Sequence, residues 1–245
     1  MKGLATKLLI LLLPAGLFGQ SAEEILGQTT LFGEAANLEI GIDMTIVKPQ
    51  GAKARGLEAF IKRDAEGSRI LLHIVSPAFL NQMKFLSHRD ARGNESRWLK
   101  TSSGIRKLSE SNRGDYLFDS DFTVEDLTEI QTEDFDLALL GEKTIGTHPC
   151  HLIEATPRFA GSTYGKKHIY VDRNSHILCA VDFFDRTGEV IKRYRLLEVQ
   201  TVEGGLYPFS CIMESLTEGT RTRLEFPRIQ IQETLPDKIF SRVSL

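Results

Sequence analysis

The chain has 245 residues and a mass of 27.5 kDa; hydrophobic residues make up 41% of it and charged residues 26%. These values are typical of a globular protein with one sizeable core and exclude a disordered, collagenous or multi-span membrane protein. The net charge of −3 and the pI near 6.1 argue against a dedicated nucleic-acid-binding protein, which usually carries a basic excess.

Residues 1–19 have the pattern of a secretory signal peptide. Two lysines precede and flank the start of the apolar run Leu8–Leu13, which is too short to span a bilayer because a span takes about 20 apolar residues. We therefore expect an exported, periplasmic protein that is cleaved after Gly19 or Ser21, with residues 20–245 forming a single domain. The alternative is an uncleaved anchor.

A short amphipathic helix is predicted for residues 22–32. Apolar residues recur at helical spacing from Ile25 to Phe32. Ser21 and Glu24 are three residues apart, which is the spacing of a capping box at a helix N-terminus.

Most of the remaining chain shows the two-residue alternation of β-strands. From Leu38 to Ile46, apolar residues alternate with polar residues or glycine, which is the pattern of a half-buried strand. Further strand-like segments, separated by turn residues, are Leu57–Arg63, Arg69–Val75, Met83–Arg89, Glu95–Lys100, Gly104–Leu108, Asp136–Thr144, Cys150–Ala155, Lys167–Asp172, Ile177–Asp185, Val190–Val202, Leu206–Ser215 and Arg221–Gln232.

This order predicts a mainly β protein with one curved antiparallel sheet, or incomplete barrel, of ten or more strands and short helices. Strands do not alternate with helices, so a parallel doubly wound sheet is excluded. A large sheet with one apolar face must close into a barrel, fold into a sandwich or curl around a helix. The predicted helices are too short to cover it. We therefore expect a partly uncovered apolar concave face suited to acyl chains or other lipids, with a well-packed sandwich as the alternative.

Residues 111–135 interrupt the strand pattern. Residues 121–127 are predicted to form a short helix capped by Asp121 or Thr123, with acidic residues in its first turn. In this segment apolar and acidic residues alternate at short intervals, so one side of it can face the sheet while the other faces water. A short helix over an open sheet can act as a lid or as a fixed plug, and both alternatives are kept.

The candidate ligand-binding residues come from this segment and from the strand before it. Phe118, Phe122 and Leu127 are the candidate lid residues, and Trp98 is the candidate for the opposing wall of the cavity. The acidic side chains of the segment are expected to face water; they are Asp119, Asp121, Glu125 and Asp126. In the fixed-plug alternative, the three apolar residues are ordinary core.

Charge is distributed unevenly along the chain. Residues 110–142 contain eleven acidic residues and one basic residue, whereas residues 52–107 contain twelve basic and five acidic residues. We expect the acidic segment to pack across a basic sheet face. The alternative is a docking surface for a charged partner.

Motifs that would indicate catalysis or a metal site are weak. His148, Cys150 and His151 offer three potential ligands within four residues, but no second cluster with ligand spacing completes a tetrahedral site, so we expect no metal or cofactor. The chain lacks a Gly-x-Ser-x-Gly elbow, a phosphate-binding loop and a His-Glu-x-x-His motif, so we expect no enzyme. Cys150, Cys179 and Cys211 all lie in strand-like segments and are expected to be buried free thiols rather than disulfide-bonded.

Several stretches match a known pattern in order and spacing. Tyr116–Leu127 is similar to an aromatic residue followed by Gly-Ser/Thr-Asp-Phe-Ser and Asp-Leu, and Trp98 with Gly104–Leu108 is similar to Trp-x-Tyr-x-Pro … Arg-Arg-Ile. Ser76–Ala78 is similar to an x-Pro-Ala turn, and Leu235–Leu245 to a Pro-x-x-x-Phe-Thr-x-x-x-Leu ending. Together they resemble the outer-membrane lipoprotein-sorting (LolA-like) family. One departure is that an aspartate, residue 119, stands where the family usually has glycine.

This resemblance implies a curved half-barrel with a lid over an apolar cavity, in an exported carrier of lipid or of lipoprotein acyl chains. The partners it implies are the lipid or acyl chain, an inner-membrane transporter and an outer-membrane acceptor, with no nucleic acid. The alternative is a periplasmic accessory or sensor protein that docks to a membrane transporter or another envelope protein without carrying lipid. A hydrolase acting on envelope components is a third and weaker alternative, because its motifs are missing.

Overall fold

The computed structural model of the chain describes residues 20–29, 32, 35–127 and 132–245. The signal peptide predicted for residues 1–19 lies outside the described residues. The strands are β1 (Asn37–Lys48), β2 (Gly51–Asp64), β3 (Gly67–Ser76), β4 (Lys84–Asp90), β5 (Glu95–Thr101), β6 (Gly104–Leu108), β7 (Phe135–Ile145), β8 (His148–Pro157), β9 (Lys166–Asp172), β10 (Leu178–Phe184), β11 (Val190–Val202), β12 (Gly205–Ser215) and β13 (Thr220–Ile231).

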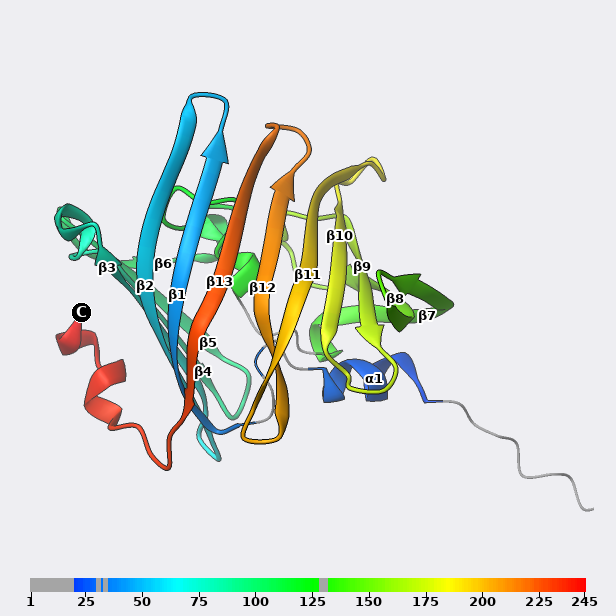
Figure 1. Cartoon of the computed structure of the whole chain (residues 1–245), viewed down its shortest axis with the longest axis horizontal. Coiled ribbons are helices and arrows are strands. Elements are labelled where there is room, and N and C mark those ends of the chain that lie inside the picture. Colours follow the sequence, from blue (N-terminus) through cyan, green and yellow to red (C-terminus); the bar gives the residue numbers. More distant parts are fainter. Residues whose placement is uncertain (1–19, 30–31, 33–34, 128–131) are drawn as a thin grey trace, which may run out of the picture.

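These thirteen strands form one sheet in the order β6-β5-β4-β3-β2-β1-β13-β12-β11-β10-β9-β8-β7 (Figure 1). Each neighbouring pair is antiparallel. Two meanders, β1 to β6 and β7 to β13, are joined by the pairing of β1 with β13. The mainly β fold and every predicted strand are thereby confirmed.

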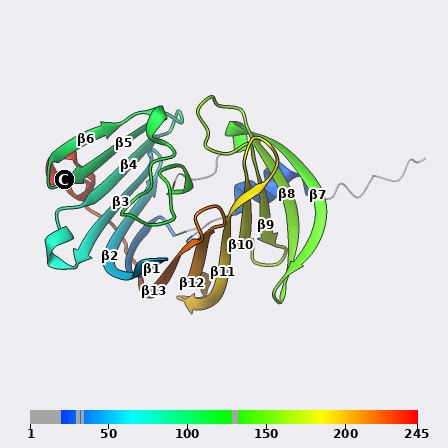
Figure 2. The same cartoon turned by 90° about the horizontal axis from the view of Figure 1, so that it is seen from above.

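The sheet curves strongly, so that its two ends face each other across a concave side (Figure 2). The alternation in β1 explains which side is buried: Leu38, Ile40, Ile42, Met44 and Ile46 are all buried. They belong to the main hydrophobic cluster of the protein, to which nearly all strands contribute. The core of the molecule therefore lies on the concave face.

β2 begins six residues earlier than the sequence predicts. The tip of the β1–β2 hairpin pairs Lys48 with Gly51, and the first four residues of β2 are exposed. Because neither side of this stretch is buried, its side chains show no alternation, and the sequence pattern starts only at Leu57.

The N-terminal helix α1 (Ala22–Gln28) begins as predicted but ends earlier. Ser21 and Glu24 form the expected capping box. At the other end, the Thr29 N–H donates to the Leu26 carbonyl and its hydroxyl donates to the Ile25 carbonyl at 2.8 Å. Thr29 has an extended backbone, so the chain leaves the helix there.

The helix predicted for residues 121–127 is wrong apart from one turn. Of the 3-10 turns in the described residues, only η3 lies in this segment; the turns are η1 (Ala78–Leu80), η2 (Glu110–Asn112), η3 (Glu125–Leu127), η4 (Thr132–Asp134), η5 (Asp237–Phe240) and η6 (Arg242–Ser244). Residues before η3 instead form a tight loop closed by a bridge between Tyr116 and Thr123. The side chains that would cap a helix bond elsewhere, as described below.

The C-terminal residues pack on the convex face. Leu235, Phe240 and Leu245 form a second cluster with Leu71 and Leu86. The segment is also tied by polar contacts: the Phe240 carbonyl lies 2.7 Å from Nε2 of His88, and Lys62 pairs with Asp237 at 2.6 Å. This cluster covers the outer side of β3, β4 and β5.

Candidate functional site

The concave face is covered by residues 109–127, which we call the cover segment. In Figure 2 this green segment runs between the two facing arms of the sheet. Leu117, Phe118, Phe122 and Val124 of this segment are buried in the main cluster, and Leu127 packs against it while partly exposed. The cover segment thus occupies the place where the sequence predicts a ligand.

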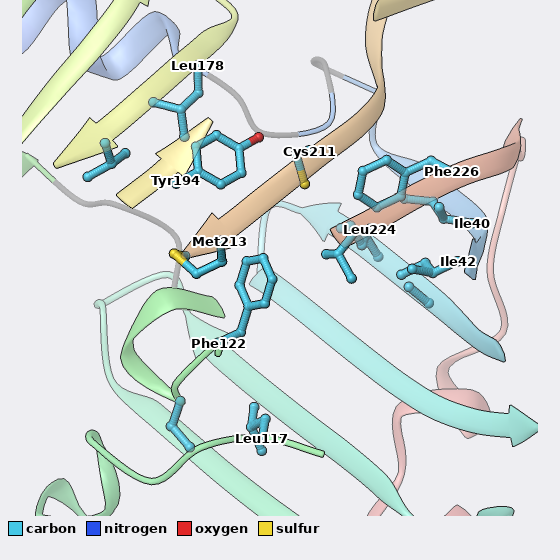
Figure 3. Packing of buried hydrophobic residues seen from close by; sticks show 14 of the residues in the cluster. Ile40, Ile42, Leu117, Phe122, Leu178, Tyr194, Cys211, Met213, Leu224 and Phe226 are labelled. Carbon is cyan, nitrogen blue, oxygen red and sulfur yellow. The ribbon is translucent and has the colours of Figure 1, made fainter. Parts of the chain in front are cut away.

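Phe122 connects the cover segment to the middle of the sheet. Its ring points toward Met213 of β12, and Leu117 lies on the same side of the loop (Figure 3). Phe122 is 7% exposed and Met213 2%. Phe118, Phe122 and Leu127 therefore all pack in or against the main cluster on the concave face, a placement that both the lid and the fixed-plug alternatives require.

Trp98 does not join them. It packs in the convex cluster with Leu86, Phe240 and Leu245, and its ring lies 5.3 Å from that of His88. In β5 the neighbouring residue, Leu99, faces the main cluster. Because side chains alternate along a strand, Trp98 points to the opposite face, and the expectation that it forms the opposing wall of the cavity is wrong.

Asp121 fixes the centre of the cover segment to β13. Its carboxylate accepts hydrogen bonds from the hydroxyls of Thr220 and Thr222, the latter at 2.6 Å. Its backbone N–H donates to the Thr222 hydroxyl oxygen at 2.9 Å. Asp121 is 2% exposed, and both oxygens of its carboxylate accept hydrogen bonds from β13. The carboxylate therefore does not cap a helix.

Glu125 is also buried, against β9 and the loop before it. It accepts hydrogen bonds from the Ser162 hydroxyl and the Thr163 N–H, both at 2.8 Å, and pairs with Lys167 at 3.3 Å. The side chains of Glu125 and Lys167 are 2% and 6% exposed. The ammonium group also lies over the rings of Phe135, Tyr164 and Phe183.

Asp126 forms the second buried ion pair, with Lys192 of β11. It accepts hydrogen bonds from the Tyr164 hydroxyl at 2.8 Å and from the Thr123 N–H at 2.7 Å. Burial alone would raise the pKa of Asp126, but the charges of Lys192 and Lys167 outweigh it and hold the pKa below its usual range. Burial, followed by the charge of Asp126, raises the pKa of Tyr164 well above its usual value.

Three of the four acidic residues expected to face water are thus buried, and this expectation is wrong for Asp121, Glu125 and Asp126. Their partners were missed by the sequence analysis. A signal for them exists: Lys167 has the same strand parity as the buried Ile169 and Val171, so its side chain must point inward. A lysine facing a core needs a buried carboxylate, and the acidic segment provides one.

Asp119 is the acidic residue that remains at the rim. It pairs with Lys48 at 2.6 Å, Lys53 at 2.7 Å and Arg55 at 3.5 Å, and its side chain is 41% exposed. Phe118 and Asp119 have φ values of 55° and 59°, in the left-handed region where glycine is favoured. The turn is kept with aspartate at the position where the resembled family usually has glycine.

The acid dependence of this rim contact provides a prediction. Hydrogen bonds from Lys48 and Lys53 lower the pKa of Asp119 from 3.8 to about 2. A lowered pKa stabilises the fold above the unfolded value and loses that contribution as pH falls through the folded value. We expect Asp119→Asn to be less stable than the wild type at pH 5 or above, with the difference disappearing toward pH 2.

Thermal unfolding of both proteins across this pH range measures the effect. Asparagine tolerates the left-handed backbone, so the substitution removes the charge without straining the turn. Lys53→Gln is the matched control, because it removes one of the positive charges beside Asp119 and should bring the pKa of that carboxyl closer to its unfolded value, so that the stability difference varies over a narrower pH range. A stability difference that stays constant with pH would contradict the assignment.

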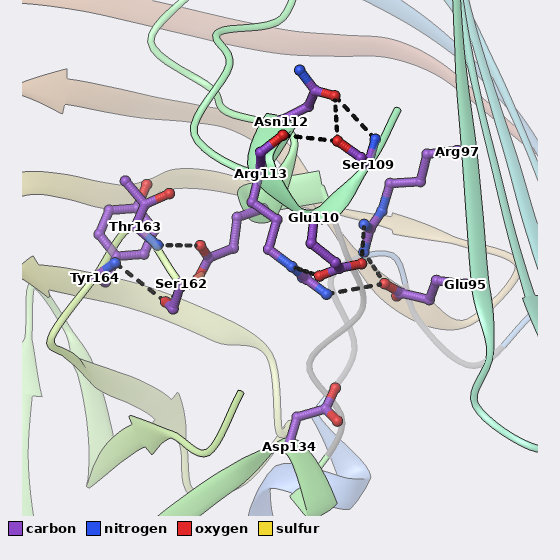
Figure 4. A network of polar contacts seen from close by, with 12 residues as sticks. Glu95, Arg97, Ser109, Glu110, Asn112, Arg113, Asp134, Ser162, Thr163 and Tyr164 are labelled. Atoms are coloured by element: carbon purple, nitrogen blue, oxygen red, sulfur yellow. Dashed lines mark hydrogen bonds and ion pairs between the residues drawn. The ribbon is translucent and has the colours of Figure 1, made fainter. Parts of the chain in front are cut away.

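The start of the cover segment is held by a separate ionic network, drawn in Figure 4. Arg113 bonds Glu110 and lies 3.9 Å from Glu95, while Arg97 pairs with Glu95 and lies 4.0 Å from Glu110. Burial, then the neighbouring Arg113, lowers the pKa of Arg97 to about 10. With Asp119 and the buried pairs, this network confirms that the acidic segment packs across a basic sheet face.

Two hollows lie beside the cover segment and the hairpin rather than under the segment. The first, about 350 Å³, lies at the β1–β2 tip and is lined by Lys48, Gln50, Gly51, Ala52 and Lys53. The second, about 160 Å³, is lined among others by Arg89, Glu95 and Arg113. Typical small-molecule sites measure about 300–1,000 Å³ and are largely apolar, so neither charged hollow suits an acyl chain.

The chain was compared with known proteins by sequence and by fold. The sequence model of a family described only as "-like: Uncharacterized protein" matches residues 66–245. No curated protein matches the sequence. In the described part of the chain, no helix combines the length and apolar character that crossing a membrane requires.

Three solved structures illustrate the similarity of the fold. A proposed outer membrane lipoprotein-sorting protein domain from Vibrio parahaemolyticus has a TM-score of 0.83 at 19% identity, covering 91% of this chain and 95% of its own. A DUF1329 family protein from Desulfovibrio piger has a TM-score of 0.84 at 18% identity, with coverages of 91% and 97%. A LolA superfamily protein from Nitrosomonas europaea has a TM-score of 0.74 at 20% identity, with coverages of 93% and 100%.

Proposed function

The chain has the LolA-like fold and belongs to the family of uncharacterized proteins whose sequence model matches residues 66–245, and we propose that it is an exported periplasmic carrier or binding protein for a lipid or for lipoprotein acyl chains. In this proposal residues 1–19 are a cleaved signal peptide and residues 20–245 form one carrier domain. An inner-membrane transporter would supply the cargo, or an outer-membrane protein would accept it. No catalytic step is part of the proposal.

The observation that carries the proposal is the way in which the concave face is covered. A continuous apolar face of a curved sheet is covered by a loop segment, and the loop contributes its own apolar side chains, among them Phe118 and Phe122. An acyl chain would replace these contacts by burying its methylene groups, each worth about 0.8 kcal/mol. A fatty chain can therefore bind tightly here without any catalytic residue.

The conformation described is the closed one, so a ligand requires the cover segment to move. The segment is held by short polar contacts to separate strands: Asp121 to β13, Glu125 to β9 and Asp126 to β11. When the segment lifts, water can solvate these charges, whereas the apolar face needs a new cover. A chain-like ligand provides that cover, and it binds the open state in preference to the closed one.

Native mass spectrometry of the protein, purified gently from its own compartment, tests the proposal. We expect a lipid or acylated peptide to co-purify with the wild type. Trp98→Phe changes the convex face only and should retain the same cargo, which makes it the matched control. A stoichiometric protein partner without lipid would contradict the carrier proposal and support the accessory alternative.

A further inference from the structure

A small buried cluster that contains two cysteines lies on the convex face, away from the cover segment. Cys150, Tyr170, Ile177, Cys179 and Ala180 form a small buried cluster distinct from the main core. It is built at one end of β8, β9 and β10, next to the β9–β10 turn, which lies at the lower end of β9 in Figure 1. Nothing in the carrier proposal uses these residues.

Three potential metal ligands converge in this cluster. One ligand atom from each of His148, Asp172 and Cys179 lies within 4.8 Å of the other two. Nδ1 of His148 is 3.1 Å from Oδ2 of Asp172. Asp172 is 4% exposed and Cys179 1% exposed, so only the imidazole reaches solvent.

Cys150 provides a fourth candidate ligand beside Cys179. Cys150 is fully buried in the same cluster as Cys179; its thiol donates to the His148 carbonyl at 3.4 Å, and the Cys179 thiol donates to the Ile177 carbonyl at 3.7 Å. The register of β10 shifts between Leu178 and Ala180, so that Cys179 is the extra residue of a bulge. A bulge re-aims a side chain, and here it turns Cys179 toward the side of the sheet that carries Cys150.

The aspartate is held in position by its own turn. Its Oδ1 accepts hydrogen bonds from the N–H groups of Asn174 at 2.9 Å and Ser175 at 2.8 Å and from the Ser175 hydroxyl at 2.9 Å. Oδ2 is thereby left to face His148. Hydrogen bonds that orient a ligand in this way are typical of protein metal sites.

We propose that His148, Cys150, Asp172 and Cys179 bind a zinc ion. Two sulfur ligands, an imidazole and a carboxylate form a donor set that Zn²⁺ accepts in tetrahedral geometry, and four protein ligands make a closed, structural site rather than a catalytic one. Ligand atoms around Zn²⁺ are separated by roughly 3.3–3.8 Å. The ligand atoms of His148, Asp172 and Cys179 lie within 4.8 Å of one another, so these three close on the ion with side-chain movements of about 1 Å. Cys150 lies outside this group and completes the site by a further side-chain rotation, and the ion then ties the start of β8 to the β9–β10 turn.

Sequence spacing explains why the site escapes a motif search. His148 and Cys150 form a first half, but Asp172 and Cys179 are supplied by the end of one strand and the beginning of the next. The antiparallel pairing of β8 with β9, in which Cys150 faces Asp172, brings the halves together. The first half is visible in the sequence but no second cluster is, because the second half is split between two strands.

Zinc binding by the purified full chain tests the proposal. After reduction and removal of metal with a chelator, the wild type should take up one Zn²⁺ per chain in competition with a chromogenic chelator. Added Co²⁺ should produce the thiolate charge-transfer absorption that two sulfur ligands give. Cys179→Ser and Asp172→Asn should each weaken Zn²⁺ binding more than about tenfold.

Cys211→Ser is the matched control, because Cys211 is an equally buried thiol that lies in the main cluster. It should bind Zn²⁺ as the wild type does. His148→Gln keeps the test decisive if a cysteine variant fails to fold, since the His148 side chain is 33% exposed. Equal zinc affinity in the wild type and the ligand variants, or an exported protein lighter by two hydrogens with Cys150 and Cys179 joined in a disulfide, would overturn the proposal.

Discussion

Asp126→Asn is expected to release the cover segment while leaving the sheet folded. The substitution keeps the shape of the side chain but removes the charge that neutralises Lys192, whose side chain is only 6% exposed. Removing one partner of a buried ion pair costs about 3–5 kcal/mol, because the remaining charge stays buried without its partner. Movement of the cover segment away from the sheet lets water solvate the Lys192 ammonium group and relieves this penalty.

This release should appear as a gain of ligand uptake. A free-energy change of about 3–5 kcal/mol corresponds to a population change of roughly a hundredfold or more. The apparent affinity for a ligand of the open state rises with the fraction of open protein. We therefore expect a fluorescent fatty-acid analogue to bind Asp126→Asn more tightly than the wild type, by up to that factor.

Hydrogen exchange resolved along the sequence should locate the effect. Amides of residues 115–127 should lose protection, whereas amides in β1, β12 and β13 should keep theirs. Asp136→Asn is the matched control: Asp136 pairs with Arg158 at 2.8 Å, but its side chain is 69% exposed, so the change should affect neither measurement. A lower melting temperature with uniform loss of protection and unchanged probe binding would show that the segment is a fixed plug.

The fold was predictable because the sheet has one buried face along most of its length. β1 alternates from Leu38 to Ile46 and β13 from Thr220 to Phe226, and alternation is the direct consequence of side chains pointing to opposite faces. The β1–β2 hairpin tip, exposed on both faces, has no such pattern. For the same reason the sequence could not show where β2 begins.

The candidate site was predictable only for its apolar members. Phe118 and Phe122 lie where a hydrophobic segment next to an open apolar face must lie. Trp98 was misplaced because two residues of β5 in succession, Trp98 and Leu99, are apolar, and the sequence does not show that the C-terminal segment covers the convex face. The buried lysines were missed because a charged residue in a strand is ordinarily assigned to the solvent side.

The helix over residues 121–127 illustrates a competition that local patterns do not reveal. Asp121 and Asp126 are good residues for a helix start, and in isolation their side chains would bond the free N–H groups of a first turn. Here Asp121 bonds two threonines of β13, and Asp126 bonds Lys192 and Tyr164. Partners between 38 and 101 residues away in the sequence thus replace the helix with a loop.

Phe122→Ala is expected to produce the second large effect, through the apolar rather than the polar contacts of the cover segment. Truncating a buried phenylalanine costs about 3–5 kcal/mol, made up of lost burial and of the cavity that remains. Phe122 is buried only while the segment is closed, so this cost falls on closure and not on the sheet. We expect the fatty-acid analogue to bind more tightly than to the wild type, with a smaller loss of global stability than a core truncation gives.

Phe85→Ala is the control that separates closure from global stability. Phe85 is 1% exposed and belongs to the same cluster, but it is part of β4 and stays in the sheet when the segment moves. Its truncation should lower the free energy of unfolding by the full core amount and leave probe binding no tighter. Equal stability losses in the two variants, together with unchanged probe binding in Phe122→Ala, would mean that Phe122 is ordinary core. If the fatty-acid analogue binds more tightly to Phe122→Ala and not to Phe85→Ala, the Phe122 ring of the wild type and the acyl chain compete for one place on the concave face.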